Sequence, residues 1–160
     1  MTSVFAFVPL TALLLATVVL GAMGLGGGIY ETALVDRVWP NNPAIIQPSR
    51  GGLNRGIFWA PVHVSYEVVL LLSAWMVWGD GYARAWIIVA LIAHFGVRAW
   101  SLLYFIPKAL WFEKAGDLTQ EQYGIARRWI QFSRFRPALE AIAIISECTI
   151  VVHIGAAATH

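Results

Sequence analysis

Ionisable side chains recur four residues apart inside segments of the chain that are otherwise apolar. This spacing places two side chains on the same face of a helix. Three such pairs and two further carboxylates occur: His63 and Glu67, His94 and Arg98, Arg136 and Glu140, together with Glu31 and Glu147. A charge at membrane depth costs at least about 2.5–3.5 kcal/mol, so these groups must face the protein interior and find partners there. We expect them to share one polar cavity between helices.

Buried ion pairs are the simplest interpretation of this cavity. Arg98 would neutralise either Glu67 or Glu140, Arg136 would neutralise the other carboxylate, and the histidines would only be hydrogen-bonded. Packed apolar residues often stabilise a protein as well as a buried ion pair does. Ion pairing therefore explains how the charges are tolerated better than why they are present.

A metal centre is the second interpretation. Carboxylates and imidazoles from different helices of a bundle hold iron in carboxylate-bridged sites, and imidazole is also a good ligand for copper. The candidate ligands are His63, Glu67, His94, Glu31 and Glu140. The Glu-x-x-His order of soluble di-iron bundles is absent, however, and the guanidinium of Arg98 would repel a cation. The cofactor is therefore left open as iron, copper or none.

Acid–base chemistry without a metal is the third interpretation. A histidine would accept a proton from a phenol-like or enolisable apolar substrate, and an arginine would hold the resulting anion. The candidate catalytic residues are His63, His94, Glu67, Arg98, Arg136 and Glu140, in which the two glutamates balance the two arginines.

Composition indicates that these residues lie in a membrane. Of the 160 residues 59% are hydrophobic and only 12% are charged, against about 25% charged residues in soluble domains, and the mean hydropathy is +0.67. Apolar segments cover about residues 4–30, 58–78, 85–106 and 135–157, and each is long enough to cross a bilayer. We expect residues 1–160 to form one integral membrane domain, an all-α polytopic four-helix bundle. Its net charge of +2 comes from scattered bases, which excludes a nucleic-acid surface.

The connections between the spans differ in basic residues, and this difference predicts orientation. Most Lys and Arg residues fall in the two long loops, which places both loops on the cytoplasmic side and both termini on the other side, in a membrane such as the bacterial inner membrane. The first long loop, residues 35–55, is rich in proline and predicts an irregular cap or lid. In the second, Thr119 and Gln122 form a capping box before Ile125, Trp129 and Phe132, which predicts a short amphipathic helix on the cytoplasmic surface.

Three motifs lie at the ends of these spans. A glycine-rich stretch leads into Tyr30 and Glu31, the third span ends in Phe105-Ile106-Pro107, and the fourth begins with Trp129, Phe132, Arg134, Arg136 and Glu140. Together they resemble the anthrone oxygenase-like family of small four-helix integral membrane proteins. The resemblance implies an oxygenase or oxidoreductase that acts on a lipophilic, phenolic small molecule, and the residues that match are Glu31, Trp129, Arg136 and Glu140.

Two other classes of function fit the same composition. A non-enzymatic accessory subunit would use its apolar surface and its glycine-rich first span to pack against partners in a larger membrane complex. A transporter would use intramembrane charges as an ion path, but four spans without an internal repeat would need to form a homo-oligomer. The bilayer is the expected partner in every case.

Overall fold

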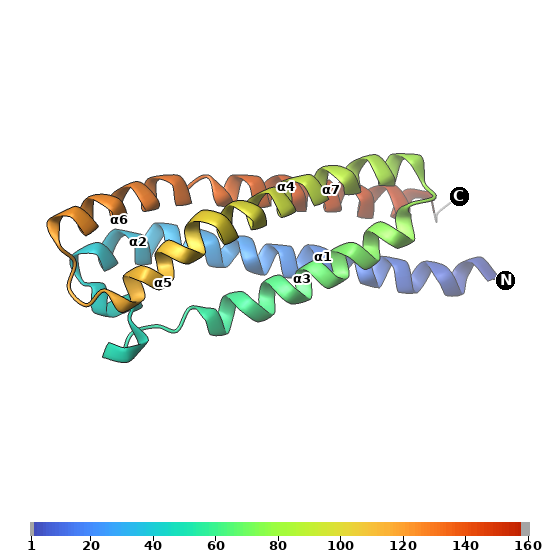
Figure 1. Ribbon diagram of the computed structural model, residues 1–160. Coiled ribbons are helices and arrows are strands. Elements are labelled where there is room, and N and C mark those ends of the chain that lie inside the picture. The colour runs from blue at the N-terminus through green and yellow to red at the C-terminus, as the bar shows by residue number, and fades with distance from the viewer. Residues whose placement is uncertain (1, 158–160) are drawn as a thin grey trace.

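The computed structural model describes the backbone of residues 2–157 and the side chains of residues 10–157, and within this part the chain is helical without any strand. Four long helices lie side by side (Figure 1): α1 (Thr2–Tyr30), α3 (Gly56–Val77), α4 (Gly81–Trp100) and α7 (Arg136–Ala157). The shorter helices gather at one end of the molecule: α2 (Asp36–Val38), α5 (Ile106–Lys114) and α6 (Gln120–Ser133).

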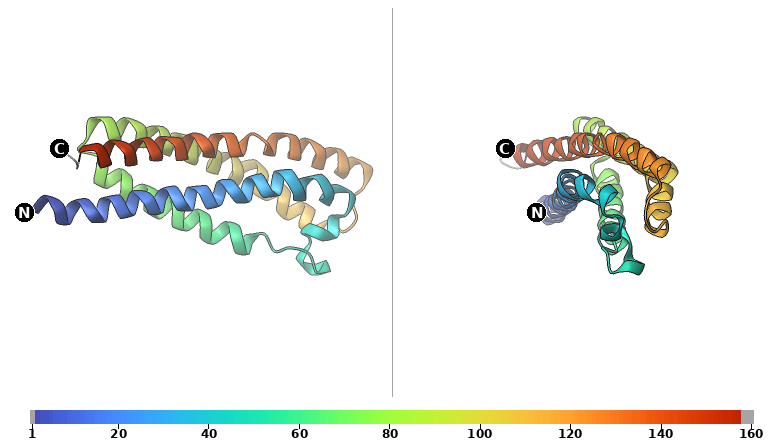
Figure 2. Two further views of the ribbon diagram at one scale, coloured as in Figure 1. Left: turned by 180° about the vertical axis from the view of Figure 1, so that it is seen from behind. Right: turned by 90° about the vertical axis from the view of Figure 1, so that its left-hand side faces the viewer.

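Each long helix contacts two others. Helix α1 contacts α3 and α7, and α4 contacts the same two helices from the other side. Both chain ends lie at the end of the molecule opposite the short helices (Figure 2). Four helical stretches are long and apolar enough to cross a membrane, namely Leu10–Asn41, Gly56–Val77, Gly81–Lys114 and Gln120–Ala157. The expected all-helical class and the four spanning segments are thereby confirmed.

Two of the spans continue well beyond their predicted ends. Helix α1 runs through a π-helical turn, Glu31–Val35, into α2, and α4 runs through a second π-helical turn, Ser101–Phe105, into α5. Helix α1 itself ends at Tyr30, and helical structure continues beyond residues 30 and 106 although a glycine-rich run and a proline usually terminate helices. Here Pro107 lies in the first turn of α5, where the missing N–H costs little.

The short helices share a hydrophobic core of their own at the loop end. Its buried members are Val35, Trp39, Ile46, Phe105, Phe112, Ala126, Trp129 and Ile130. The capping box of α6 is present as predicted, with Thr119 and Gln122 each accepting a hydrogen bond from the other's backbone N–H. The apolar side of α6, however, packs against this core through Ile125 and Trp129, and only Phe132 is strongly exposed, at 47%. Contact of this helix with the membrane surface stays a prediction.

The proline-rich loop forms an ordered irregular cap, as predicted. It consists of short 3-10 turns at Trp39–Asn41, Pro43–Ile46 and Pro48–Arg50. Buried Gln47 fixes the cap to the end of α5, because its amide nitrogen donates to the carbonyl oxygens of Phe112 at 3.0 Å and Gly116 at 2.7 Å. The cap therefore closes one end of the helix set.

Asp80 joins two helices at the opposite end. One carboxylate oxygen accepts a hydrogen bond from the Ala83 backbone N–H at 2.9 Å and caps α4, while the other lies 3.0 Å from Nε2 of His153 on α7. The N–H of Ala83 and the His153 ring hold the pKa of the Asp80 carboxyl below its ordinary value. A lowered pKa means that this stabilisation is complete above the unfolded pKa of about 3.9 and is lost as the pH falls through the folded pKa.

Replacing Asp80 with alanine is therefore expected to lower the free energy of unfolding by about 1 kcal/mol at neutral pH, the usual cost of a lost N-cap. The deficit should shrink as the pH falls below about 4, because the wild-type carboxyl then becomes neutral. Thermal unfolding in detergent between neutral and acidic pH measures both effects. Asp80→Asn is the matched control, since it keeps an N-cap without a titrating group. A deficit of the same size at every pH would contradict this account.

Candidate active site

Four of the predicted site residues meet in a network that links α3, α4 and α7. Nε of Arg98 donates to Oε1 of Glu67 at 2.5 Å, and the same oxygen lies 3.6 Å from Nε2 of His94. Nδ1 of His94 lies 3.1 Å from Oε2 of Glu140. The His94 ring is fully buried. The His94 ring thus forms a hydrogen bond with Glu140 and lies close to Glu67, while its buried Nε2 has no hydrogen-bond partner. Arg98 neutralises Glu67.

Arg136, which was expected to form an ion pair with one of these carboxylates, is not part of the network. The pair of Arg98 with Glu67 is one of the two that the sequence left open. Arg136 was expected to pair with the remaining carboxylate, Glu140, but that carboxylate contacts His94 instead. Within residues 10–157 no carboxylate lies within 4.0 Å of Arg136.

The groups in direct contact with Arg136 are neutral, and the carboxylates of Glu31, Asp36 and Glu140 act on its charge from a greater distance. Nη2 donates to Oγ of Ser133 at 2.7 Å, and the guanidinium carbon lies 4.3 Å from the centre of the Phe105 ring and 5.8 Å from that of Trp129. Its Nε is buried and has no hydrogen-bond partner. Arg136 is also the first residue of α7, where the partial positive charge of a helix N-terminus disfavours a cation. The environment therefore leaves this cation able to bind an anion.

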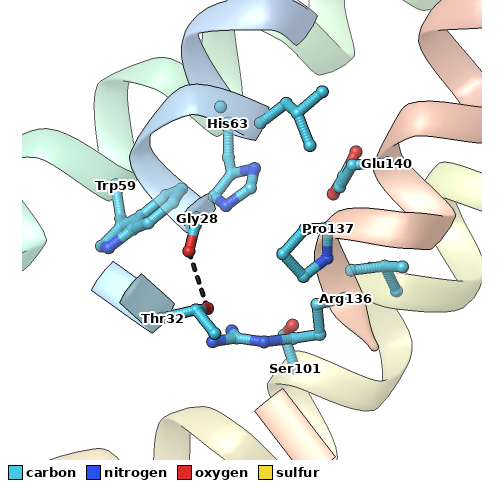
Figure 3. A pocket seen from close by; sticks show the side chains of 11 residues that line it. Gly28, Thr32, Trp59, His63, Ser101, Arg136, Pro137 and Glu140 are labelled. Carbon is cyan, nitrogen blue, oxygen red and sulfur yellow. Dashed lines mark hydrogen bonds between the residues drawn. The ribbon is translucent and has the colours of Figure 1, made fainter. Parts of the chain in front are cut away.

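Arg136 and His63 lie between two cavities. The smaller, of about 30 Å³, is lined by Gly28, Thr32 and Glu140 among others. Figure 3 shows the side chains of His63, Glu140 and Arg136 arranged around this space. The larger is a cleft of about 320 Å³ that opens to the outside. Four residues line both spaces: Trp59, His63, Ser101 and Arg136. A ligand in the cleft would reach both His63 and Arg136.

The two π-helical turns supply walls of the cleft. Glu31 is the first residue of one turn, and Ser101 and Phe105 are the first and last residues of the other; all three line the cleft. A π-helical turn adds a residue to a helical turn, and such turns are frequent at functional sites. The helical stretches that begin with α1 and α4 therefore both contain a π-helical turn beside the same cleft.

Glu31 positions His63 through Trp59. Nε1 of Trp59 donates to Oε1 of Glu31 at 2.9 Å, and the Trp59 ring stacks on the His63 ring with centroids 5.2 Å apart and an interplanar angle of 18°. Close packing of α1 on α3 supports this arrangement, because a Cβ at Gly27 would come within 2.5 Å of the Phe58 ring. No side-chain hydrogen bond to the His63 ring occurs within residues 10–157, so its nitrogens are free for a ligand.

The expected metal centre is not supported. No group of three His, Cys, Asp or Glu side chains in the described part of the chain is placed to hold a metal ion. The five candidate ligands divide between different interactions: Glu31 accepts from Trp59, His63 stacks on the same ring, and His94 lies between Glu67 and Glu140.

Other polar contacts were missed or only partly foreseen. Arg55, at the start of α3, forms an ion pair with Glu113 of α5 at 2.9 Å, and both line the cleft. The sequence analysis placed Glu113 in a loop, because it ended the third span at residue 106. Deeper between the helices, the hydroxyl of Tyr66 donates to the carboxylate of Glu147, and both side chains are buried. The aligned spacing of Glu140 and Glu147 had indicated only that both lie on one face.

No protein-family model matches this chain, and neither a curated protein nor a solved structure matches it. The resemblance to the anthrone oxygenase-like family therefore stays a hypothesis that depends on the motifs at the span ends. Function has to be argued from the geometry of the cleft.

Proposed function

We propose that the protein is a membrane-embedded enzyme of the oxygenase or oxidoreductase type that acts on a lipophilic, phenolic small molecule. The observation that supports this most is the placement of Arg136, a partly buried cation with no carboxylate within 4.0 Å, and of His63, a histidine without a hydrogen bond, on the wall of one cleft. A neutral phenol that enters the cleft would meet a proton acceptor and a site for its anion.

His63 is the proposed general base. A general base must lie within reach of the proton that it takes, and the His63 ring faces both cavities. Stacking on Trp59 fixes the plane of this ring. His94 was an equal candidate by sequence, but it is fully buried between Glu67 and Glu140 and lines neither cavity. His94 is therefore assigned to holding Glu140, which lines the smaller cavity.

Arg136 is the proposed binding group for the phenolate. Hydrogen bonds between a guanidinium and an anionic oxygen are about twice as strong as neutral ones. Arg98 and Arg55 also line the cleft, but each already has a carboxylate within 3 Å, namely Glu67 and Glu113. In an oxygenase the co-substrate is dioxygen. In this proposal His63 removes the phenol proton, and Arg136 holds the electron-rich phenolate in apolar surroundings.

We further propose that the end of the molecule with the short helices faces the cytoplasm of a bacterial inner membrane. The positive-inside rule supports this orientation. The basic residues of the loop end are Arg37, Arg50, Arg55, Lys108, Lys114, Arg127, Arg128 and Arg134, whereas the opposite turn has Arg84. The cleft would then lie near the cytoplasmic boundary of the membrane.

Binding of 2-naphthol to the purified protein in lipid nanodiscs tests the proposal, because the neutral phenol and the naphtholate absorb at different wavelengths. We expect naphtholate to form on the protein at neutral pH, where free naphthol is protonated. Arg136→Gln should weaken binding by about 10- to 100-fold, the equivalent of one hydrogen bond to a charged group. Arg134→Gln, an exposed neighbour, is the matched control and should bind as the wild type does. Absence of naphtholate in the wild type would overturn the proposal.

A further inference from the structure

The cleft is lined by both polar and apolar side chains. Its ionisable side chains are Glu31, Arg55, His63, Arg98, Glu113 and Arg136. The apolar part of the lining includes Phe105, Ile106, Ala109 and Leu110, from the end of the π-helical turn and from α5. A ligand that fills this space must combine polar atoms with apolar surface.

An ion pair joins α3 and α5 at the loop end of the cleft. Arg55 directly precedes α3 and Glu113 lies in the last turn of α5. Their side chains meet at 2.9 Å and are only 10% and 20% exposed. A ligand tail that left the cleft toward the loops would have to pass this charged pair.

The sides of the cleft are apolar and exposed. On α3, Ile57 and Val64 flank the lining residues and are 73% and 58% exposed. On α5, Leu110 is 49% exposed, and Leu103 in the adjoining π-helical turn is 83% exposed. Both helices belong to stretches that are long and apolar enough to cross a membrane. The rim between α3 and α5 is therefore suited to contact lipid chains.

We propose that the substrate is a phenolic head group attached to an apolar tail, an inference that rests on the proposed function. The head group lies against His63 and Arg136, and the tail leaves sideways between α3 and α5 into the lipid. The volume of the cleft, about 320 Å³, is at the lower end of the roughly 300–1,000 Å³ of sites for drug-sized ligands. It accommodates a ring system, so a tail attached to that ring must leave the cleft.

Two tryptophan substitutions test this arrangement. Ala60 on α3 and Ala109 on α5 both line the cleft, and tryptophan at either position would fill the side exit. Binding of 2-naphthol is compared with binding of a naphthol that carries a long alkyl chain, in nanodiscs and relative to empty nanodiscs. Ala85→Trp, at an exposed position on α4 outside the cleft, is the control.

We expect Ala60→Trp and Ala109→Trp to weaken binding of the alkylated naphthol by about 10-fold or more, the usual effect of overpacking. Binding of 2-naphthol should weaken clearly less than that of the alkylated naphthol, and Ala85→Trp should change neither ligand. Equal losses for both ligands, or no loss for either, would overturn the lateral tail while leaving the proposed function intact. If wild-type protein ionises neither naphthol, the proposed function and this inference both fail.

Discussion

Replacing Arg98 with alanine is expected to lower the free energy of unfolding by about 3–5 kcal/mol, the cost of leaving one charge of a buried ion pair without its partner. The guanidinium lies 2.5 Å from Glu67, and the two side chains are only 17% and 25% exposed. Without Arg98, the Glu67 carboxylate keeps only His94 near it, at 3.6 Å. Equilibrium unfolding in mixed micelles measures the loss.

Two further variants identify the cause of that loss. Arg84→Ala removes an exposed arginine from the same helix and should change the free energy of unfolding by no more than about 0.5 kcal/mol. The double variant Glu67→Leu with Arg98→Leu removes both charges and should recover most of the stability, since apolar replacements of a buried pair are often neutral or stabilising. If Arg98→Ala is as mild as Arg84→Ala, the ion pair does not hold α3 and α4 together.

The spanning helices were largely predictable because hydropathy depends only on composition along the chain. Predicted residues 58–78 and 135–157 lie close to α3 (Gly56–Val77) and α7 (Arg136–Ala157). The ends of the other two spans were not predictable in this way. Continuation of a helix past Glu31 or Pro107 depends on a π-helical turn, and such a turn is stabilised by its packing against other elements rather than by local sequence.

The convergence of charged residues was also predictable, but the choice of partners was not. The cost of a charge at membrane depth predicted that Glu67, Arg98 and Glu140 all face the protein interior. Which of them touch depends on how each helix is rotated about its axis, and this rotation is set by side-chain packing across the whole interface. The sequence consequently predicted a partner for Arg136, whereas Glu140 turns toward His94.

Arg136, which has no carboxylate within 4.0 Å, makes the cleft suited to bind an anion. Burial of a charge is costly, and a position at the start of α7 adds an unfavourable interaction with the helix dipole. Contacts with Phe105 and Trp129 offset part of this cost. A residue retained in such a place is a stronger candidate for ligand binding than Arg98 or Arg55, whose charges are already matched.

Replacing His63 with phenylalanine is expected to abolish naphtholate formation on the protein and to lower turnover of its phenolic substrate by about 10²- to 10⁴-fold, the usual contribution of a general base. Phenylalanine keeps a flat ring against Trp59, whose stacking on His63 has centroids 5.2 Å apart, but it has no nitrogen to accept a proton. His63→Ala should give the same chemical loss, with a weaker contact to Trp59. Unfolding measurements should show that both variants remain folded.

Variants of two other histidines, His153 and His94, distinguish loss of the general base from damage to the fold. His153→Ala removes a histidine that contacts Asp80 at the far end of α7 and should leave naphthol ionisation unchanged. His94→Ala should lower stability, because it leaves Glu140 and Glu67 facing each other without the imidazole between them. The ratio of naphtholate to neutral naphthol, measured by absorption at saturating ligand, is the readout. If His63→Phe still ionises bound naphthol as the wild type does, His63 is not the base, and the proton must pass to another group that lines the cavities, such as Glu140.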